Sequence, residues 1–326
     1  MTPNLTASFL GLELKSPIIA ASSGMTKTKA SIKTLEKAGV GAVILKSIFE
    51  EQIMSEAGEL TKDAYYPEAA DYINQYAKSN SLETYKEFIK ELKSEVKIPI
   101  IASINCYNSG DWVNFVKEIT AAGADAIELN IFSINTNKHF DSQAYEANYY
   151  SIVRQVYTAT KLPLLVKISP YFTNILDVVD HLRFEGARAV TLFNRFFQTD
   201  IDLDALKVVP GNRFTSPDMM HNTLRWTALC SGRIKDMEFS ASTGVHNSDT
   251  AIKMLLAGAS SVQICSALYQ EGADLIVKMN EEISAFMKKH NFKSIDEFKG
   301  MLSHKGDENT NLFERSQFMK YFSSDN

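Results

Sequence analysis

The sequence predicts an α/β protein, a (β/α)8 TIM barrel in a single domain, and three observations predict it. Eight short runs rich in Ile, Val, Leu and Ala alternate along the chain with stretches of helical period. The runs are continuously apolar, which is typical of parallel strands covered by helices. The length of 326 residues, with 45% hydrophobic content, is enough for one barrel.

The expected strands lie at 16–22, 41–47, 98–104, 126–132, 162–168, 189–194, 238–243 and 261–266. Helical patterns between them lie at 31–39, 81–96, 111–123, 144–160, 174–186 and 248–258. Three of these patterns end in Gly39, Gly123 and Gly258, where a helix C-terminus favours a left-handed residue. A doubly wound open sheet is the competing fold, but it predicts a G-x-G-x-x-G turn after the first strand. "AASSGMTKT" has a single glycine there, which favours the barrel.

The barrel is expected to span residues 1–303, followed by a tail at 304–326 that packs on the outside or on a partner subunit. Two connections, 48–81 and 195–221, are longer than the others. Long loops after barrel strands usually carry function, because these loops form the face where ligands bind.

Composition favours a small-molecule enzyme. The net charge of −5 is spread without a basic block, which argues against a nucleic-acid or anionic-membrane partner. No apolar stretch is long enough to span a bilayer, and the N-terminus lacks the pattern of a signal peptide, so we expect a soluble, cytoplasmic protein. Three scattered cysteines and the absence of H-x-E or C-x-x-C patterns predict reduced thiols and no metal site.

In a barrel, chemistry is expected at the carboxyl ends of the strands. Polar or small residues stand at every one of these ends: Ser22, Ser23, Gly24, Lys46, Ser47, Ser103, Asn105, Asn130, Ser133, Asn135, Lys167, Asn194, Thr243, Gly244, Cys265 and Ser266.

Two lysines lie inside otherwise apolar strands, Lys46 in "AVILKS" and Lys167 in "LLVKIS". A buried unpaired ammonium group costs several kcal/mol. Each lysine therefore needs an anionic or electron-rich partner, which is either a structural acidic neighbour such as Glu128 or a ligand at a catalytic site.

The last two strands pass through small residues into helices, in "SASTGVHNS" and "QICSALYQEG". In barrels, the loops after strands seven and eight are the usual phosphate site. Thr243, Gly244, Cys265 and Ser266 are therefore phosphate candidates, although small residues also simply permit tight turns.

The segments "IPIIASINCYNSGDW", "GADAIELNIF", "LPLLVKISPYF" and "LLAGASSVQICSALYQEG" resemble the FMN-dependent dihydroorotate dehydrogenases of pyrimidine biosynthesis. The first of them also resembles the pyrimidine-reducing domain of dihydropyrimidine dehydrogenase. The resemblance covers about residues 5–290. It implies an FMN across the barrel mouth with its phosphate at the four candidates above. It further implies that the flavin ring contacts Ala21, Ser22, Lys46, Ser103, Asn130 and Lys167, and that the pyrimidine contacts Asn130, Asn135 and Asn194.

The family motif that carries the catalytic base aligns with "ELNIFSIN" and places the base at Ser133, with Lys46 and Lys167 assisting catalysis. Four features depart from the family. Phe132 and Ile134 flank the base position, and "DAYYPEAADYINQY" lacks the N-x-M-G-x-x-N substrate loop. "RFTSPDMM" replaces the glycine-rich phosphate turn, and Arg195 replaces a small polar residue, where it either binds a substrate carboxylate or is solvated.

The resemblance implies oxidation of dihydroorotate to orotate by an FMN oxidoreductase acting on a CH–CH donor, with a soluble electron acceptor and a homodimer. Two alternatives stay open. One is reduction of a uracil-like ring, and the other is a flavin-binding barrel without activity on dihydroorotate.

Overall fold

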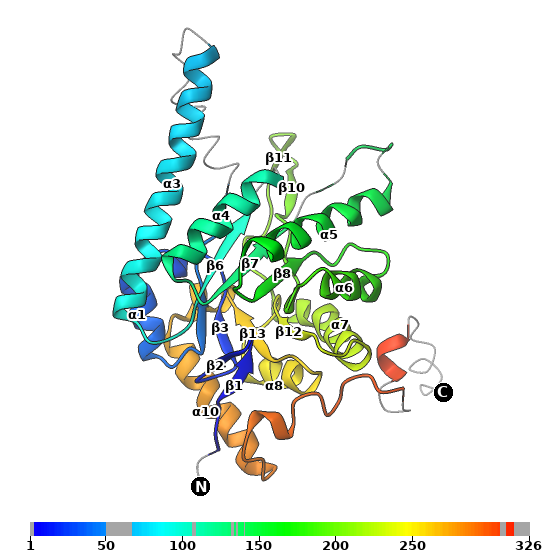
Figure 1. Cartoon of the computed structure of the whole chain (residues 1–326). Helices are drawn as coiled ribbons and strands as arrows, with labels where there is room; N and C mark the ends of the chain where they lie inside the picture. Colours follow the sequence, from blue (N-terminus) through cyan, green and yellow to red (C-terminus); the bar gives the residue numbers. More distant parts are fainter. Residues whose placement is uncertain are drawn as a thin grey trace.

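The chain folds into a closed ring of eight parallel strands (Figure 1). The computed structural model describes residues 3–49, 67–105, 109–131, 134, 136–139, 141–306 and 311–315. In ring order the strands are β3 (Ile18–Ala20), β4 (Ala42–Ile44), β6 (Ile100–Asn105), β7 (Ala126–Asn130), β8 (Leu164–Ile168), β9 (Ala189–Leu192), β12 (Glu238–Ala241) and β13 (Ser261–Ile264). β13 pairs with β3, and β4 pairs with both β3 and β6, which closes the ring. The predicted (β/α)8 barrel is confirmed.

Helices cover the outside of the ring, where all but the last two connect successive strands and the last two follow β13 (Figure 1). They are α1 (Lys29–Lys37), α3 (Pro67–Glu95), α4 (Ser109–Ala122), α5 (Ser142–Ala159), α6 (Ile175–Phe184), α7 (Met220–Arg233), α8 (Ser248–Leu256), α9 (Ser266–Glu271) and α10 (Asp274–Lys289). The large core lies between these helices and the strands. Gly39, Gly123 and Gly258 have φ of +88°, +93° and +110°, as expected for glycines that end helices.

Side chains inside the barrel form an apolar lower layer and a polar upper layer. Ile101 and Leu165 belong to the apolar cluster of the barrel interior. Successive side chains of a strand point to opposite faces, so the residues two positions later also point inward, nearer the carboxyl end. These are Ser103 in β6 and Lys167 in β8. The same alternation places Lys46, Glu128, Thr191, Ser240 and Gln263 in this upper layer.

A hairpin of β1 (Ala7–Phe9) and β2 (Leu12–Leu14) closes the amino-terminal end of the barrel. Phe9, Leu10 and Leu14 are buried and pack in the same cluster as the lower interior layer. The Leu10 N–H also donates to Glu238 Oε2 at 2.6 Å. With this end filled by apolar side chains, ligands have access to the interior from the carboxyl end.

The predicted elements are right in kind and order, but their bounds differ. The strands are shorter than predicted because the residues at the barrel mouth no longer form the hydrogen bonds of the parallel sheet. The Lys46 N–H, for example, donates to the Thr26 carbonyl in a loop. Helix α3 is longer than the predicted 81–96 and projects beyond the barrel (Figure 1). The long connection 195–221 contains a hairpin of β10 (Thr199–Asp202) and β11 (Lys207–Pro210), and β5 (Ile48–Phe49) extends the pairing of β6.

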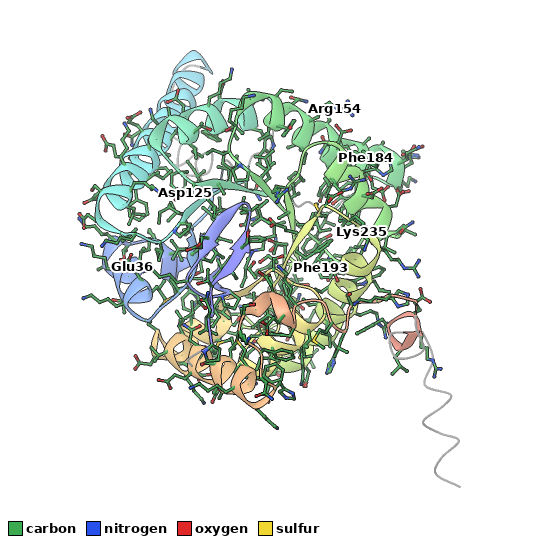
Figure 2. All side chains as sticks on the ribbon, turned by 60° about the horizontal axis from the view of Figure 1, so that its bottom comes forward. Glu36, Asp125, Arg154, Phe184, Phe193 and Lys235 are labelled. Atoms are coloured by element: carbon green, nitrogen blue, oxygen red, sulfur yellow. The ribbon has the colours of Figure 1, made fainter. Side chains whose placement is uncertain are left out.

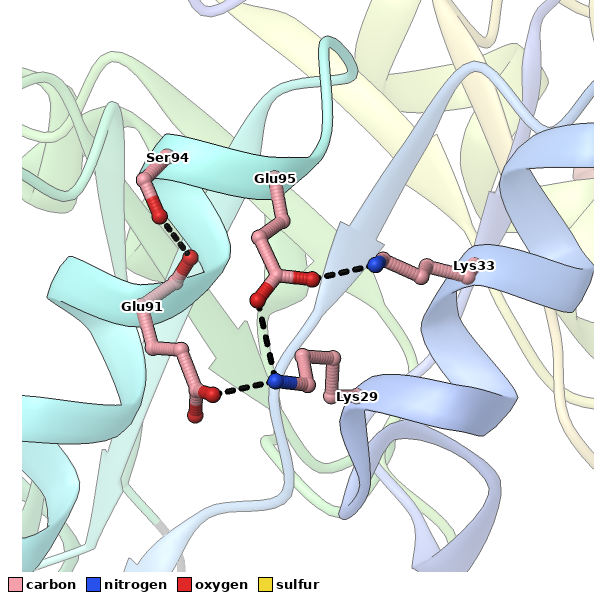
Figure 3. A network of polar contacts seen from close by, with 5 residues as sticks. All are labelled: Lys29, Lys33, Glu91, Ser94 and Glu95. Carbon is pink, nitrogen blue, oxygen red and sulfur yellow. Dashed lines mark hydrogen bonds and ion pairs between the residues drawn. The ribbon is translucent and has the colours of Figure 1, made fainter.

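Helices α1 and α3 are joined by a cluster of charged side chains on the surface (Figure 3). Lys29 forms an ion pair with Glu91 and with Glu95, the latter at 2.9 Å, and Lys33 also pairs with Glu95. The Ser94 hydroxyl donates to the Glu91 carbonyl at 2.7 Å. Since these side chains are partly exposed, each pair adds little stability by itself.

The start of the predicted tail packs on α7. His304 is buried, and its N–H donates to the Ala228 carbonyl at 3.0 Å. The described part of the tail includes η4 (Asn311–Glu314), whose Glu314 pairs with Arg233 of α7 and lies 3.0 Å from His304 Nε2. The boundary between residues 303 and 304 stays a prediction. Among the described residues, no helix is long and apolar enough to cross a membrane.

Candidate functional site

A cavity of about 200 Å³ opens at the carboxyl end of the barrel. It is lined by Ala21, Ser22, Lys167, Phe193, Asn194, Arg195, Arg213, Thr215, Ser242, Thr243, Gly244, Val245, Gln263, Cys265 and Ser266. Phe193 lies near the middle of the ring, whereas Arg154 and Phe184 lie on its outer side (Figure 2). Many of the residues that the sequence analysis nominated thus line one cavity, and they come from the ends of β3, β8, β9, β12 and β13.

Lys167 stands in the wall of this cavity without a partner. It is only 8% exposed and is preceded by the apolar Leu164–Val166 run of β8. Across the part of the chain that the structure describes, its ammonium group makes no hydrogen bond or ion pair, and Glu128 in particular does not pair with it. The structural ion pair with Glu128, one of the two alternatives for this lysine, is therefore wrong. A buried cation facing a cavity favours an electron-rich ligand.

Gln263 is a cavity residue that the sequence patterns did not nominate. It is 1% exposed, and its amide nitrogen donates to Thr191 at 2.9 Å and to Ser240 at 3.2 Å. Its carbonyl oxygen Oε1 is buried without a hydrogen bond among the described residues. A polar residue inside the apolar run "SVQI" is the same signal that flagged the two lysines. Together, Lys167 and Gln263 offer an unused donor and an unused acceptor to a ligand.

A hydrogen-bonded chain of side chains runs through the ends of β3, β4, β6 and β7. Ser22 Oγ lies 3.0 Å from Ser47 Oγ, and Ser47 Oγ lies 2.7 Å from Ser103 Oγ. The Ser103 hydroxyl then lies 2.9 Å from Glu128 Oε1 and donates to it. Glu128 is fully buried, and its Oε2 has no partner among the described residues. Ser103 belongs to this hydrogen-bonded series of side chains and does not line the cavity.

Asn130 and Asn194 are joined directly. Asn194 Nδ2 donates to Asn130 Oδ1 at 2.7 Å, and Asn130 is the neighbour of Lys167 in the register of β7 and β8. Asn130 is 7% exposed, while Asn194 lines the cavity. The bond fixes the orientation of both amides, so Asn130 presents its Nδ2 and Asn194 its Oδ1 for further bonds. Lys46, at the end of β4, is half-buried and does not line the cavity.

Arg195 uses its guanidinium group on the backbone. Its Nη1 donates to the Arg213 carbonyl at 3.0 Å, and its Nη2 donates to the Asn212 carbonyl at 2.8 Å. Its Nε is buried without a partner in the described structure. Each Nη carries a second hydrogen, so these bonds use two of the five guanidinium N–H donors and leave Nε–H and one N–H on each Nη for a ligand.

The four phosphate candidates line one end of the cavity together. Thr243 and Gly244 have φ of +81° and +80°, and the Thr243 hydroxyl donates to the Phe193 carbonyl at 3.0 Å. A Cβ on Gly244 would lie 2.3 Å from the backbone nitrogen of Met220, so glycine is required for α7 to approach this closely. Burial raises the pKa of the Cys265 thiol, against the opposing effect of the cations Lys167 and Arg213.

Two nominated residues, Ser133 and Asn135, lie outside the described residues, as do Phe132 and Cys106. Of their neighbours, Ile134 is 70% exposed and His139 is exposed. The described residues contain no group of three or more His, Cys, Asp or Glu side chains that could hold a metal ion.

Fold and cavity together define a (β/α)8 barrel whose carboxyl end carries a cationic pocket for a polar ligand. A family model described as dihydroorotate dehydrogenase matches residues 4–287, and the chain therefore belongs to the dihydroorotate dehydrogenase family. It is an oxidoreductase of pyrimidine metabolism acting on a CH–CH donor, and its family is flavin-dependent. The predicted family and reaction class are confirmed.

Several similar proteins are described as dihydroorotate dehydrogenase B (NAD(+)), catalytic subunit. The one from Methanocella arvoryzae is 30% identical over 304 residues, which cover 91% of this chain and 97% of that protein. The one from Thermoplasma volcanium is 28% identical over 314 residues, 91% of this chain and 98% of that protein. The one from Methanocaldococcus jannaschii is 26% identical over 311 residues, 91% of this chain and 97% of that protein.

Proposed function

We propose that the cavity binds FMN and that the chain oxidises dihydroorotate to orotate at the barrel mouth. The observation that carries the proposal is the buried Lys167, which has no hydrogen-bond or ion-pair partner among the described residues and faces the cavity. The unpaired Gln263 Oε1 supports it, because a flavin ring carries both N–H donors and electron-rich oxygen and nitrogen atoms. The cavity is smaller than most ligand sites, so a nucleotide would extend out through its opening.

The chain's own residues then have separate roles. Lys167 would place a positive charge beside the part of the cofactor that gains negative charge, and Thr243, Gly244, Cys265 and Ser266 would hold its phosphate. When bound, FMN accepts the hydride that leaves C6 of dihydroorotate. Ala21 and Ser22, which line the cavity, would contact the flavin ring. Ser103 of β6 and Lys46 after β4 would contact the same ring from their strands.

Substrate binding and proton removal belong to the loop after β7 in this proposal. Asn130 and Asn194, held together by their mutual bond, would orient the pyrimidine amides, together with Asn135. Ser133 Oγ would take the proton from C5 as the hydride leaves C6, which balances the two-electron oxidation. A serine near its ordinary pKa is a weak base and needs a neighbouring acceptor for its own proton.

We propose that a soluble acceptor carries the electrons away from the flavin. The name "catalytic subunit" of the similar NAD(+) proteins supports a separate electron-transferring chain as that acceptor.

The homodimer and the cytoplasmic location stay predictions. The β10–β11 hairpin presents a strongly exposed apolar surface that a dimer could cover, made of Ile201, Leu203, Leu206 and Val208. Sedimentation of the wild type beside a Leu203→Asp, Leu206→Asp variant tests that assignment.

The visible spectrum of the purified protein tests the main proposal. We expect a yellow protein whose flavin absorption bleaches when dihydroorotate is added without oxygen, and does not bleach with dihydrouracil. Bleaching by dihydrouracil alone would show that the substrate is a uracil-like ring and not dihydroorotate. Bleaching by neither compound would leave a flavin-binding barrel, and a colourless protein that takes up no added FMN would refute the proposal.

A further inference from the structure

Arg213 is a further cation in the wall of the cavity, beside Lys167 and Arg195. It lies in the loop between β11 and η2 (Pro217–Met219), and it lines the cavity together with Thr243, Gly244 and Ser266. Over the described ranges, its guanidinium group makes no hydrogen bond or ion pair. Its Cζ lies 5.4 Å from the centre of the Tyr269 ring and 5.5 Å from that of Phe214. The two aromatic rings support the guanidinium and leave its N–H groups free for a ligand.

The loop that carries Arg213 is fixed from two sides. Arg195 donates to the carbonyls of Asn212 and Arg213. On the other side, the Thr215 N–H donates to Ser266 Oγ at 3.0 Å, and Thr215 Oγ1 lies 2.8 Å from His246 Nε2. These contacts tie the loop to the strand ends that form the phosphate site.

The aromatic support of Arg213 is fixed as well. The Gly24 N–H donates to the Tyr269 hydroxyl at 2.7 Å, which holds the Tyr269 ring against the turn after β3. The guanidinium is therefore held in place before any ligand arrives, which lowers the entropy lost on binding.

We propose that Arg213 binds the phosphate group of the flavin and makes the site selective for FMN over riboflavin. This inference rests on the proposed function. A guanidinium binds a phosphate through two parallel N–H···O bonds and adds a full charge, whereas a backbone turn offers N–H groups alone. The segment "RFTSPDMM", which begins at Arg213, stands where the family has a glycine-rich phosphate turn, so in this chain a charged side chain takes over part of that role.

Flavin titration of the full-length protein, freed of bound flavin, tests this proposal. Fluorescence gives the Kd of FMN and of riboflavin for the wild type, Arg213→Gln and Arg213→Lys. We expect Arg213→Gln to weaken FMN binding roughly 10- to 100-fold, as for the loss of a charged hydrogen bond, and to change riboflavin binding less than about twofold. Arg213→Lys keeps the charge and should retain most of the preference for FMN. Wild-type FMN affinity should fall with added salt more steeply than that of Arg213→Gln.

Arg225→Gln is the matched control, because Arg225 is an exposed arginine on α7 that does not line the cavity. It should leave both Kd values unchanged. Equal weakening of FMN and riboflavin by Arg213→Gln would show that Arg213 only shapes the loop and would overturn the inference, as would unchanged FMN binding. Those outcomes leave tight FMN binding by the wild type intact, whereas wild-type protein that binds no FMN refutes the proposed function itself.

Discussion

The barrel mouth has two sides that treat their polar groups differently. On the cavity side, formed by the ends of β8, β9, β12 and β13, Lys167 and Gln263 Oε1 are buried or nearly so and lack partners in the described structure. On the hydrogen-bonded side, formed by the ends of β4, β6 and β7, Ser47 and Ser103 bond to each other and Ser103 bonds to Glu128.

The difference teaches which side is built for a ligand. Buried polar groups are normally paired within the protein, because a lost hydrogen bond is costly in a low-dielectric interior. The hydrogen-bonded side largely follows this rule and supports the mouth. The cavity side departs from it, and a flavin that supplies the absent partners accounts for the departure.

Removing the unpaired cation gives the largest expected effect. Lys167→Met keeps most of the apolar part of the side chain and removes the charge, and flavin reduction by dihydroorotate should slow about 10²- to 10³-fold, as for other losses of charge stabilisation at a reacting centre. Stopped-flow absorbance measures the rate. Lys161→Met is the control, because Lys161 is exposed and lies just before the same strand, at the opposite end of the barrel. Equal rates in Lys167→Met and wild type would remove the main support for a ligand on the cavity side.

The shape of the cavity side depends on Gly244. Gly244→Ala combines a positive φ with a contact of 2.3 Å to the Met220 backbone, and it should lower the free energy of unfolding by about 2–4 kcal/mol. Gly123→Ala is the matched control, because Gly123 has φ of +93° and nothing within 4 Å of the position that a Cβ would take. Its free energy of unfolding should fall by about 1–2 kcal/mol, from the backbone conformation alone. Urea unfolding compares the two. Equal losses would mean that the close approach of α7 adds no constraint.

A substitution in the hydrogen-bonded side tests whether it is structural. Ser103→Ala removes the partner of Glu128 Oε1, so that neither oxygen of this buried carboxyl group has a hydrogen bond among the described residues, and the free energy of unfolding should fall by about 1–3 kcal/mol. Ser94→Ala removes an exposed serine hydroxyl and should change the free energy of unfolding by less than about 0.5 kcal/mol. A Ser103→Ala protein as stable as wild type would contradict the structural role of this side.

The surface cluster between α1 and α3 gives the smallest expected effect. Hydrogen bonds from Lys33 and Lys29 hold the pKa of Glu95 below its usual range. This contribution to stability is present above the unfolded pKa near 4.5 and is lost as the pH falls through the lower folded pKa. Glu95→Gln should therefore lower Tm slightly at about pH 7 and less at about pH 3. Glu87→Gln, on the exposed face of the same helix, is the control. An equal Tm loss at both pH values would argue against the ion pairs.

Part of the candidate site was predictable from local sequence, because a charged or small residue inside or after an apolar strand is unusual wherever the strand lies. That signal found Lys167, Thr243, Gly244 and Cys265, which share the cavity. It would also have found Gln263 if applied to every strand. Arg213 gave no such signal, because an arginine in a polar loop looks solvated until the fold brings it to the strand ends.

The sequence by itself determined the order of strands and helices and the family, because continuous apolar strands, helical periods and helix-ending glycines are encoded within short segments. Only the tertiary structure decided which strand ends share the cavity, that Arg195 holds a loop, and that a hairpin fills the opposite end of the barrel. Those features depend on contacts between distant segments, such as Thr215 with Ser266 and Gly24 with Tyr269. Such pairings arise when the barrel closes, and no local pattern records them.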